Sequence, residues 1–237
     1  MSRACEVCGA DAFSDLFREG AYQWERCANC GFVRLSDLLS LADAAATENV
    51  HAAGYAELGA RKFASKMRRN RKRAQKIWRR RPGDRFLDVG SNYGFMVEAA
   101  AECGFEAVGV EIAADLAEAA RQRFPAREFR IGALEALNFG AEKFDCVYCS
   151  EVIEHTVDPR AFARGIANVM PSGGLLYLTT PHVREYERNG WRGIGAPGHK
   201  ICFDNETIAR LLLDCGFAKV MHEFTFRRGI KLWAVRA

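Results

Sequence analysis

Residues 86–94 read F-L-D-V-G-S-N-Y-G, an apolar strand that runs into a glycine-rich turn. A second apolar strand, at residues 107–110, ends on Glu111, twenty-three residues after Asp88. The glycines let the backbone approach a ligand closely, and an acid at the tip of the next strand can accept hydrogen bonds from both hydroxyls of a ribose. This pattern predicts an adenosine-binding strand–helix–strand unit.

The spacing of the turn distinguishes between two kinds of adenosine cofactor. A dinucleotide fingerprint would read G-x-G-x-x-G, with helix N-terminal amides facing a pyrophosphate. Here three residues separate Gly90 from Gly94, and Asp88 stands inside the strand just before the turn. A carboxylate there would repel a pyrophosphate but suits an ammonium group. S-adenosylmethionine carries an α-amino group, a sulfonium and a ribose without phosphate, so it fits better. An ordinary turn with surface acids is the alternative.

The turn resembles motif I, D-V-G-x-x-x-G, of the class I S-adenosylmethionine-dependent methyltransferases, and the resemblance covers residues 83–237. It implies that the turn at 90–94 wraps the methionine moiety, with Asp88 near its ammonium group. The same resemblance implies that Glu111 binds the ribose hydroxyls.

The resemblance also implies an adenine site. Ile112 would pack against the adenine, and the loop at 132–135 would meet its edge through backbone groups. Many family members carry Asp directly after the glycine of this loop, where the present chain has Ala133. That difference leaves open whether Glu135 contacts the adenine amino group instead. The residues expected to bind the cofactor are Asp88, Gly90, Ser91, Asn92, Gly94, Glu111, Ile112, Ala133, Leu134 and Ser150.

Strands and helices alternate along the rest of the chain. The order predicts an α/β fold: a Rossmann-like, seven-stranded, mostly parallel sheet with a terminal antiparallel hairpin and helices on both faces. Ligands of such sheets bind at the carboxyl ends of the strands, where Asp88, Glu111 and residues 150–155 fall. After the first two strands, further strands are expected at 129–132, 144–149, 175–180, 217–223 and 231–235, and helices at 113–124 and 205–215, the last capped by Asp204.

Four cysteines near the N-terminus form a metal-binding pattern. The pairs Cys5-x2-Cys8 and Cys27-x2-Cys30 are separated by eighteen residues, and a glycine follows each pair. Four thiolates at this spacing match an all-cysteine structural zinc site of the zinc-ribbon kind, and a redox role is the alternative. Residues 1–35 are too few to fold around an apolar core alone, so we expect metal binding to supply folding free energy.

Residues 150–155 read S-E-V-I-E-H and follow the fourth expected strand. They resemble the E-x-x-E-H element of the ubiquinone-type O-methyltransferases. If this segment is helical, Glu151, Glu154 and His155 share one face. His155 would act as a general base oriented by Glu154, with His199 as a second candidate base.

The resemblance leaves two other interpretations of these residues open. In some relatives the same residues and a downstream histidine bind a divalent ion, which here predicts Mg²⁺ or Mn²⁺ at Glu151, Glu154, His155 and His199. Alternatively, His155 merely caps a helix and lines the pocket.

Two other segments have unusual composition. Residues 61–85 hold thirteen Lys or Arg and one acid, a local charge of +12 that leaves about −8 for the rest of a chain whose net charge is +4. This basic stretch predicts that residues 36–82 form an amphipathic connector that packs on the catalytic domain. An anion site is the alternative. Residues 181–202 are rich in glycine and charge and predict a lid over the acceptor, with His182 and His199 as pocket candidates.

The composition indicates the compartment and the possible functions. No apolar run approaches the ~20 residues of a membrane span. Nine cysteines without a secretion signal favour reduced thiols or bound metal in the cytoplasm. We expect a methyltransferase acting on a hydroxyl or carbon of a small polar acceptor, such as a nucleotide-linked sugar. An RNA methyltransferase that docks through the basic helix and zinc ribbon, and a non-catalytic cofactor-binding protein, are the alternatives.

Overall fold

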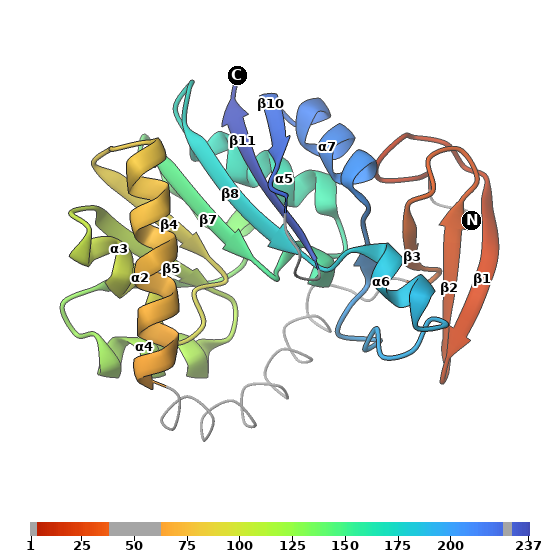
Figure 1. Cartoon of the computed structure of the whole chain (residues 1–237), viewed down its shortest axis with the longest axis horizontal. Helices are drawn as coiled ribbons and strands as arrows, with labels where there is room; N and C mark the ends of the chain where they lie inside the picture. Colours follow the sequence, from red (N-terminus) through yellow and green to blue (C-terminus); the bar gives the residue numbers. More distant parts are fainter. Residues whose placement is uncertain (1–3, 38–62, 225–228) are drawn as a thin grey trace.

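The computed structural model describes residues 4–37, 63–224 and 229–237. Its main element is a seven-stranded sheet with strand order β10-β11-β8-β7-β4-β5-β6 (Figure 1). The five strands from β8 to β6 are parallel, and β11 pairs antiparallel with both β8 and β10. This arrangement confirms the predicted fold class. The strands are β4 (Arg85–Val89), β5 (Glu106–Glu111), β6 (Glu128–Ile131), β7 (Cys146–Ser150), β8 (Leu175–Thr180), β10 (Phe217–His222) and β11 (Ile230–Arg236).

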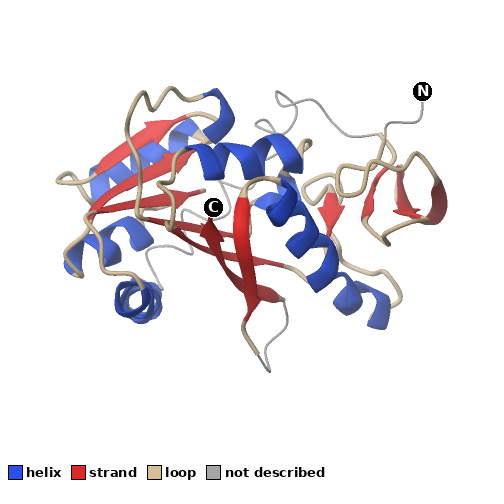
Figure 2. Ribbon diagram, turned by 90° about the horizontal axis from the view of Figure 1, so that it is seen from above, coloured by secondary structure: helices blue, strands red, loops and turns tan. Residues whose placement is uncertain are grey.

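Helices cover both faces of this sheet (Figure 2). Alternate strand residues point to opposite faces, so Phe86 joins the apolar cluster under α2, α3 and α4 while Leu87 joins the cluster under α5 and α7. Burial on both faces explains why the strands read as nearly continuous apolar runs. The helices are α2 (Phe63–Arg80), α3 (Phe95–Glu102), α4 (Ala114–Arg123), α5 (Pro159–Asn168), α6 (Val183–Arg188) and α7 (Asn205–Asp214), with 3₁₀ turns η1 (Leu134–Ala136) and η2 (Ile153–His155).

Helix caps fix where two of these helices begin. The carboxylate of Asp204 accepts from the amides of Glu206 and Thr207, and the Thr207 hydroxyl accepts from the Asp204 amide, which completes a capping box. This confirms the cap that the sequence predicts. Asp158 caps α5 by accepting from the amides of Arg160 and Ala161, with Pro159 at the first helical position.

The N-terminal module is a second, smaller sheet of four strands in the order β1-β2-β3-β9. The last strand belongs to the catalytic part of the chain, because it follows α6 far along the sequence (Figure 1). Residues 181–202, expected as an irregular lid, therefore contain a short helix and a strand that pairs with the N-terminal module. The strands are β1 (Phe13–Glu19), β2 (Tyr22–Cys27), β3 (Val33–Leu35) and β9 (Ile201–Cys202).

The basic helix α2 packs on the catalytic domain along its apolar stripe. Met67, Ala74 and Ile77 are buried against α3 and the sheet. Several of its basic side chains contact the same domain: Arg71 pairs with Glu102, Lys76 with Glu223, Arg73 donates to the Tyr148 hydroxyl, and Arg80 lies over the Trp233 ring. This confirms the amphipathic interpretation of the helix. The rest of the predicted connector, residues 38–62, lies outside the described part of the structure.

No helix in the described part of the chain combines the length and the apolar character that a bilayer crossing requires.

Candidate active site

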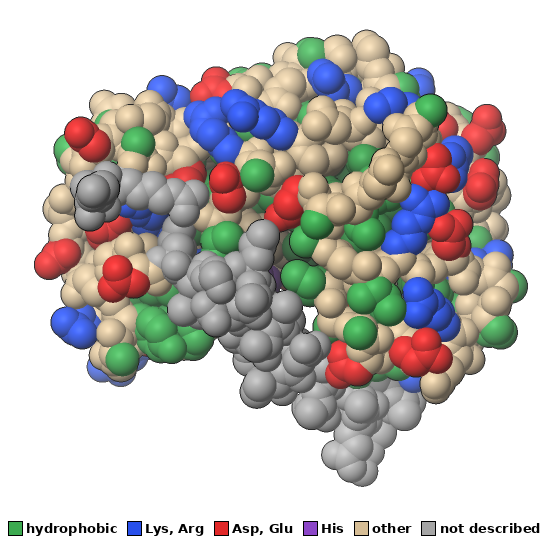
Figure 3. Space-filling view, turned by 180° about the vertical axis from the view of Figure 1, so that it is seen from behind, with side chains coloured by type: hydrophobic (Ala, Val, Ile, Leu, Met, Phe, Trp, Pro, Cys, Tyr) green, Lys and Arg blue, Asp and Glu red, His purple; other side chains and the backbone are tan. Residues whose placement is uncertain are grey.

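A cavity of about 570 Å³ lies at the carboxyl ends of β4, β5 and β7, where the sequence places the site. Figure 3 shows the face of the molecule opposite α2, on which basic and acidic side chains are interspersed. The described residues that line the cavity are Val89, Gly90, Asn92, Val110, Glu111, Ile112, Leu116, Gly132, Ala133, Leu134, Glu135, Ser150, Glu151, Val152, Glu154, His155, Thr156, Phe162, Ile194, Gly195, Gly198 and His199.

The glycines of the turn after β4 allow close packing that no larger residue permits. A Cβ on Gly90 would lie 2.3 Å from Cγ2 of Val152, and a Cβ on Gly94 would lie 2.5 Å from the Phe129 ring. Both residues also have positive φ angles, 74° and 75°, which L side chains rarely adopt. The turn therefore has this shape only because both positions are glycine.

Glu111 holds this turn against the end of β5. One carboxylate oxygen accepts from the backbone amide of Asn92 at 2.8 Å, and the other accepts from the amide of Ala113 at 3.0 Å. Asn92 itself has a left-handed backbone with φ 48°, a conformation that Asn tolerates better than most residues. The carboxylate that the sequence assigns to the ribose thus also fixes the loop that would surround the rest of the cofactor.

Seven of the ten residues expected to bind the cofactor line the cavity, and three do not. Asp88 is buried beside Tyr148 of the neighbouring strand. Ser91 is buried under the turn, where its hydroxyl has no hydrogen-bond partner among the described residues. Gly94 caps the start of α3. These three residues shape the turn from behind rather than forming the cavity wall.

The environment of Asp88 opposes its negative charge. Burial, with a smaller effect from the charge of nearby Glu111, raises the pKa of Asp88 from 3.8 to about 8. Arg73 of α2 acts in the opposite direction. Burial of Asp88 therefore favours its protonated form in the free protein.

At the other end of the cavity, Glu154, His155 and His199 bring their ligand atoms within 4.8 Å of one another. The two imidazole rings meet edge to face, with centroids 4.8 Å apart. Glu154 is buried and accepts from the Thr180 hydroxyl at 2.9 Å. All three residues predicted to be catalytic are thus together in one cluster, although nothing in the sequence spacing places His199 beside the other two.

The hydrogen bond of His155 determines which of its nitrogens is basic. Its Nδ1 lies 3.0 Å from the carbonyl oxygen of Gly198, which can only accept. Nδ1 therefore carries the proton in the neutral ring, and Nε2 is the nitrogen that can take up another. His199 approaches the Tyr186 hydroxyl through its own Nδ1 at 3.3 Å.

Two further residues singled out from the sequence lie elsewhere. Glu151 has a left-handed backbone with φ 58°, and its carboxylate accepts from the Thr179 hydroxyl at 2.7 Å. The predicted shared helical face does not form, because the helical turn begins only at Ile153. Glu151 lines the cavity outside the cluster. His182 caps α6 by accepting from the Arg184 amide and does not line the cavity.

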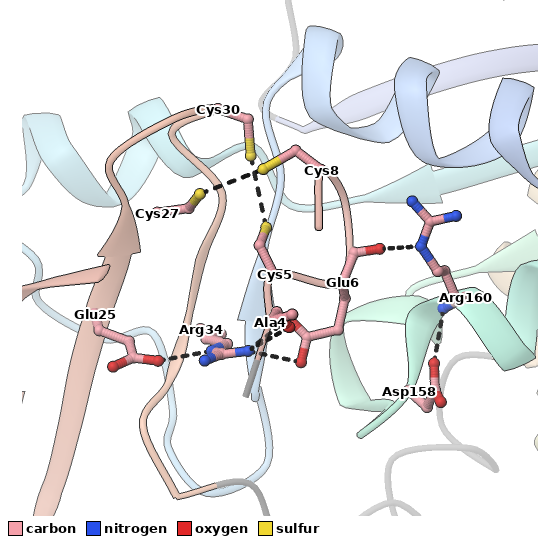
Figure 4. Close-up of polar contacts among 10 residues, drawn as sticks. All are labelled: Ala4, Cys5, Glu6, Cys8, Glu25, Cys27, Cys30, Arg34, Asp158 and Arg160. Carbon is pink, nitrogen blue, oxygen red and sulfur yellow. Dashed lines mark hydrogen bonds and ion pairs between the residues drawn. The ribbon is translucent and has the colours of Figure 1, made fainter. Parts of the chain in front are cut away.

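The four N-terminal cysteines form a compact sulfur cluster (Figure 4). The Sγ atoms of Cys5 and Cys30 lie 3.7 Å apart, and those of Cys8 and Cys27 lie 3.6 Å apart. A tetrahedral zinc ion with Zn–S bonds of about 2.3 Å would place its sulfurs about 3.8 Å from one another, so the geometry fits a structural zinc ion. All four positions are cysteine, which leaves none for a substrate.

The first cysteine pair is anchored to the catalytic domain. Arg160 in the first turn of α5 donates to the backbone carbonyl of Glu6 at 2.6 Å (Figure 4). It also donates to the carbonyl of Val7 at 2.8 Å. Behind the cluster, buried Arg34 bonds both carboxylate oxygens of Glu6 at 2.9 Å and also binds Glu25 at 2.7 Å. The module therefore has a fixed orientation relative to the cavity.

The family model for a methyltransferase domain matches residues 59–222, well over half of the chain. The chain belongs to this methyltransferase family. Among curated relatives, the ubiquinone biosynthesis O-methyltransferase of Xanthomonas campestris is 36% identical over 106 residues, which are 42% of this chain and 44% of the relative. The Xanthomonas axonopodis enzyme of the same name is 34% identical over 103 residues, 41% and 43% of the two chains. The chain spans less than half the length of these relatives.

Solved methyltransferases share the fold. CalS10, an amino pentose methyltransferase of Micromonospora echinaspora solved with bound S-adenosylmethionine, has a TM-score of 0.59 and 19% identity over 76% of this chain and 96% of its own. The N-terminal domain of EvdMO1, solved with S-adenosylhomocysteine, has a TM-score of 0.56 and 21% identity over 71% and 81% of the two chains. Together with the family match, these comparisons show the fold of a methyltransferase domain.

Proposed function

We propose that this methyltransferase transfers the methyl group of S-adenosylmethionine to a hydroxyl oxygen of a small polar acceptor. An acidic carbon of the acceptor is the second candidate for the methylated atom. The observation that carries the proposal is the cluster of Glu154, His155 and His199 at the end of the cavity away from Glu111. Glu111 and the 90–94 turn would hold the nucleoside and methionine parts of the donor. The methyl group would then face the imidazoles.

His155 is the best placed base for the acceptor hydroxyl. Its Nδ1 proton is directed at the Gly198 carbonyl, which orients Nε2 as the proton acceptor. Methyl transfer to an activated carbon needs mainly alignment and exclusion of water, and a positioned base adds about 100- to 10,000-fold. Glu154 would stabilise the imidazolium that forms, and His199, whose ring lies against that of His155, would bind the acceptor beside it.

The same three side chains could hold a divalent cation instead. One carboxylate and two imidazoles with open positions favour Mn²⁺ over Mg²⁺, because imidazole nitrogen is a poor ligand for magnesium. Such an ion would lower the pKa of a bound acceptor hydroxyl. We propose structural zinc at Cys5, Cys8, Cys27 and Cys30 as a separate site.

The charge of the cavity narrows the acceptor class. The described lining includes four carboxylates, on Glu111, Glu135, Glu151 and Glu154, and no Lys or Arg. An uncharged or cationic compound with hydroxyls, such as a sugar, suits this lining better than a phosphate. A nucleotide-linked sugar fits only if its diphosphate lies outside the described lining.

The structure offers less support for RNA as the acceptor. Several basic side chains of α2 are engaged with acids and aromatic rings of their own domain. We propose a division into a zinc module at residues 1–35, a basic connector at 36–82 and a catalytic domain at 83–237, located in the cytoplasm. In this division the connector has a packing role.

The test is His155→Gln, assayed with labelled methyl donor on a panel of sugars, amino sugars and catechols. We expect turnover to fall about 100- to 10,000-fold, because the base is lost, while calorimetric affinity for S-adenosylmethionine is unchanged. His182→Gln is the matched control, since that histidine lies outside the cavity. Full activity of the His155 variant would refute the role of the base. Cofactor binding without turnover on any acceptor would favour the non-catalytic alternative.

A further inference from the structure

The zinc module contacts a loop on the acceptor side of the cavity through the tip of its β1–β2 hairpin. Glu19, the last residue of β1, accepts hydrogen bonds from the backbone amides of Gly195 and Ala196, each at 3.1 Å. The same carboxylate accepts from the indole N–H of Trp24 at 3.3 Å. A carboxylate thus binds two consecutive amides of a loop that is 176 residues away in the sequence.

This loop carries the residues that face the acceptor. Gly195, Gly198 and His199 all line the cavity. The carbonyl of Gly195 accepts from the amide of His199 at 3.1 Å, and the carbonyl of Gly198 lies 3.0 Å from Nδ1 of His155. The peptide that Glu19 holds is therefore one hydrogen bond away from the His199 backbone, and the same loop contacts His155 through Gly198, three residues further along.

Further contacts fix both ends of the same segment to the module. At its start, Trp191 stacks on Phe17 with ring centroids 5.0 Å apart, and Arg26 lies over the Trp191 ring. Trp191 has a left-handed φ of 62°, a costly conformation for an aromatic residue that this packing stabilises. At its end, Ile201 and Cys202 pair as β9 with β3, and the amide of Leu35 donates to the carbonyl of Lys200 at 2.9 Å.

We propose that Glu19 is a positioning residue for the acceptor side of this active site, and that the zinc module builds that side of the cavity by holding residues 191–202. The inference rests on the proposed function for the role of His199. It does not depend on the identity of the acceptor. The cofactor side lies within the catalytic domain and is independent of Glu19.

The chemistry of Glu19 explains why a carboxylate is needed. Each of its two oxygens can accept from a separate amide, and hydrogen bonds to a charged acceptor are about twice as strong as neutral ones. Glutamine at this position keeps the length but offers only one accepting oxygen. Glu19→Gln should therefore retain the hairpin and release one of the two amides.

The experiment compares wild type, Glu19→Gln and Glu19→Ala by amide hydrogen exchange and by imidazole NMR on the whole chain. We expect exchange of the Gly195 and Ala196 amides to rise about 10- to 100-fold in Glu19→Ala and by less in Glu19→Gln. The ring resonances of His199 and His155 should shift, while those of His182 and His222 stay in place. Asp15→Asn is the matched control. Asp15 is exposed and lies on the same strand, and its substitution removes the same charge.

The outcomes separate this inference from the proposed function. Unchanged exchange at Gly195 and Ala196 together with unchanged His199 resonances, in a variant that keeps its melting temperature, would overturn the role of Glu19. Calorimetric titration with S-adenosylmethionine tests the cofactor side alone. The affinity of both variants for S-adenosylmethionine should differ from that of wild type by less than about twofold. A large loss of that affinity in Glu19→Gln would contradict the separation of the two sides. If the wild-type protein does not bind S-adenosylmethionine, the proposed function is wrong. The exchange and NMR results would still support the positioning role of Glu19.

Discussion

The two ends of the cavity are assembled in different ways. The cofactor end comes mainly from one strand–helix–strand unit, in which Glu111 bonds the Asn92 amide only 19 residues away. The acceptor end combines the turn after β7, the loop at 194–199 and the tip of the N-terminal hairpin, whose Glu19 lies 176 residues from Gly195. The comparison teaches that the proposed donor site is built from residues close in sequence, whereas the proposed acceptor site depends on tertiary packing.

The largest expected effect follows from loss of the metal. Cys27→Ser removes one thiolate from the sulfur cluster, and zinc-dependent folding of small modules involves about 10–16 kcal/mol. We expect native mass spectrometry to show loss of zinc, and hydrogen exchange to rise throughout β1, β2, β3 and residues 194–202. Donor affinity should persist. Cys103→Ser, a cysteine outside the cluster, is the control. Donor affinity lost in parallel with zinc would show that the two ends are not independent.

The next effect concerns the cofactor end. Gly90→Ala adds a methyl group 2.3 Å from Val152 and forces alanine to a φ of 74°. Overlap and backbone strain together should lower the free energy of unfolding by about 2–4 kcal/mol and weaken donor binding at least about tenfold. Chemical denaturation and calorimetry measure the two quantities.

The matched control for this variant is Gly140→Ala. Gly140 also has a positive φ, 55°, but no atom of the described residues lies within 4 Å of the position that the added methyl group would take. This variant should lose only the strain contribution, about 1 kcal/mol, and keep full donor affinity. Equal losses for the two variants would mean that contact with Val152 does not matter.

A smaller effect is expected at Glu111. Glu111→Gln keeps one accepting oxygen but loses the second amide bond, to Asn92 or Ala113. Hydrogen bonds to a charged group contribute about 1.5–3 kcal/mol, so donor affinity should fall about 10- to 100-fold. His199 resonances should not move in the free protein, because the change lies at the other end of the cavity. Shifted His199 resonances in this variant would argue that the two ends of the cavity are not structurally independent.

The stability of the protein should also depend on pH through Asp88. Its pKa is raised from 3.8 to about 8 by burial, so between these values the folded protein binds more protons than the unfolded chain. The contribution of Asp88 therefore lowers the free energy of unfolding as pH rises from about 4 to about 8, by up to about 1.4 kcal/mol per pH unit.

Asp88→Asn should remove this contribution from the pH dependence of denaturant midpoints. Asp115→Asn changes an exposed acid in the first turn of α4 and should leave the pH dependence of the denaturant midpoint as in wild type. Identical pH profiles for wild type and Asp88→Asn would show that Asp88 is ionised in the free protein.

The sequence was sufficient for the parts of the molecule whose signals are local. Apolar runs alternating with helical segments predict the sheet, the glycine spacing predicts the turn after β4, and paired cysteines predict the sulfur cluster. The three residues predicted to be catalytic do come together. Each of these signals is a short pattern of residue types, which a single chain displays directly.

The remaining features depend on long-range packing. Ile201 and Cys202 become a strand only because β3 offers an edge, and two residues give no periodic signal. The helical face expected for Glu151 fails because that residue adopts a left-handed backbone, with its carboxylate bonded to Thr179. Glu19 had no sequence signal at all, since its role comes from the loop that packs against it.

The most direct test of the account is NMR of the imidazole groups during titration with S-adenosylmethionine. We predict saturable shifts for His155 and His199, whose rings line the end of the cavity where the methyl group would lie, and none for His182, which lies outside it. Saturation with His155 and His199 both unmoved would contradict the placement of the donor between Glu111 and the histidine cluster.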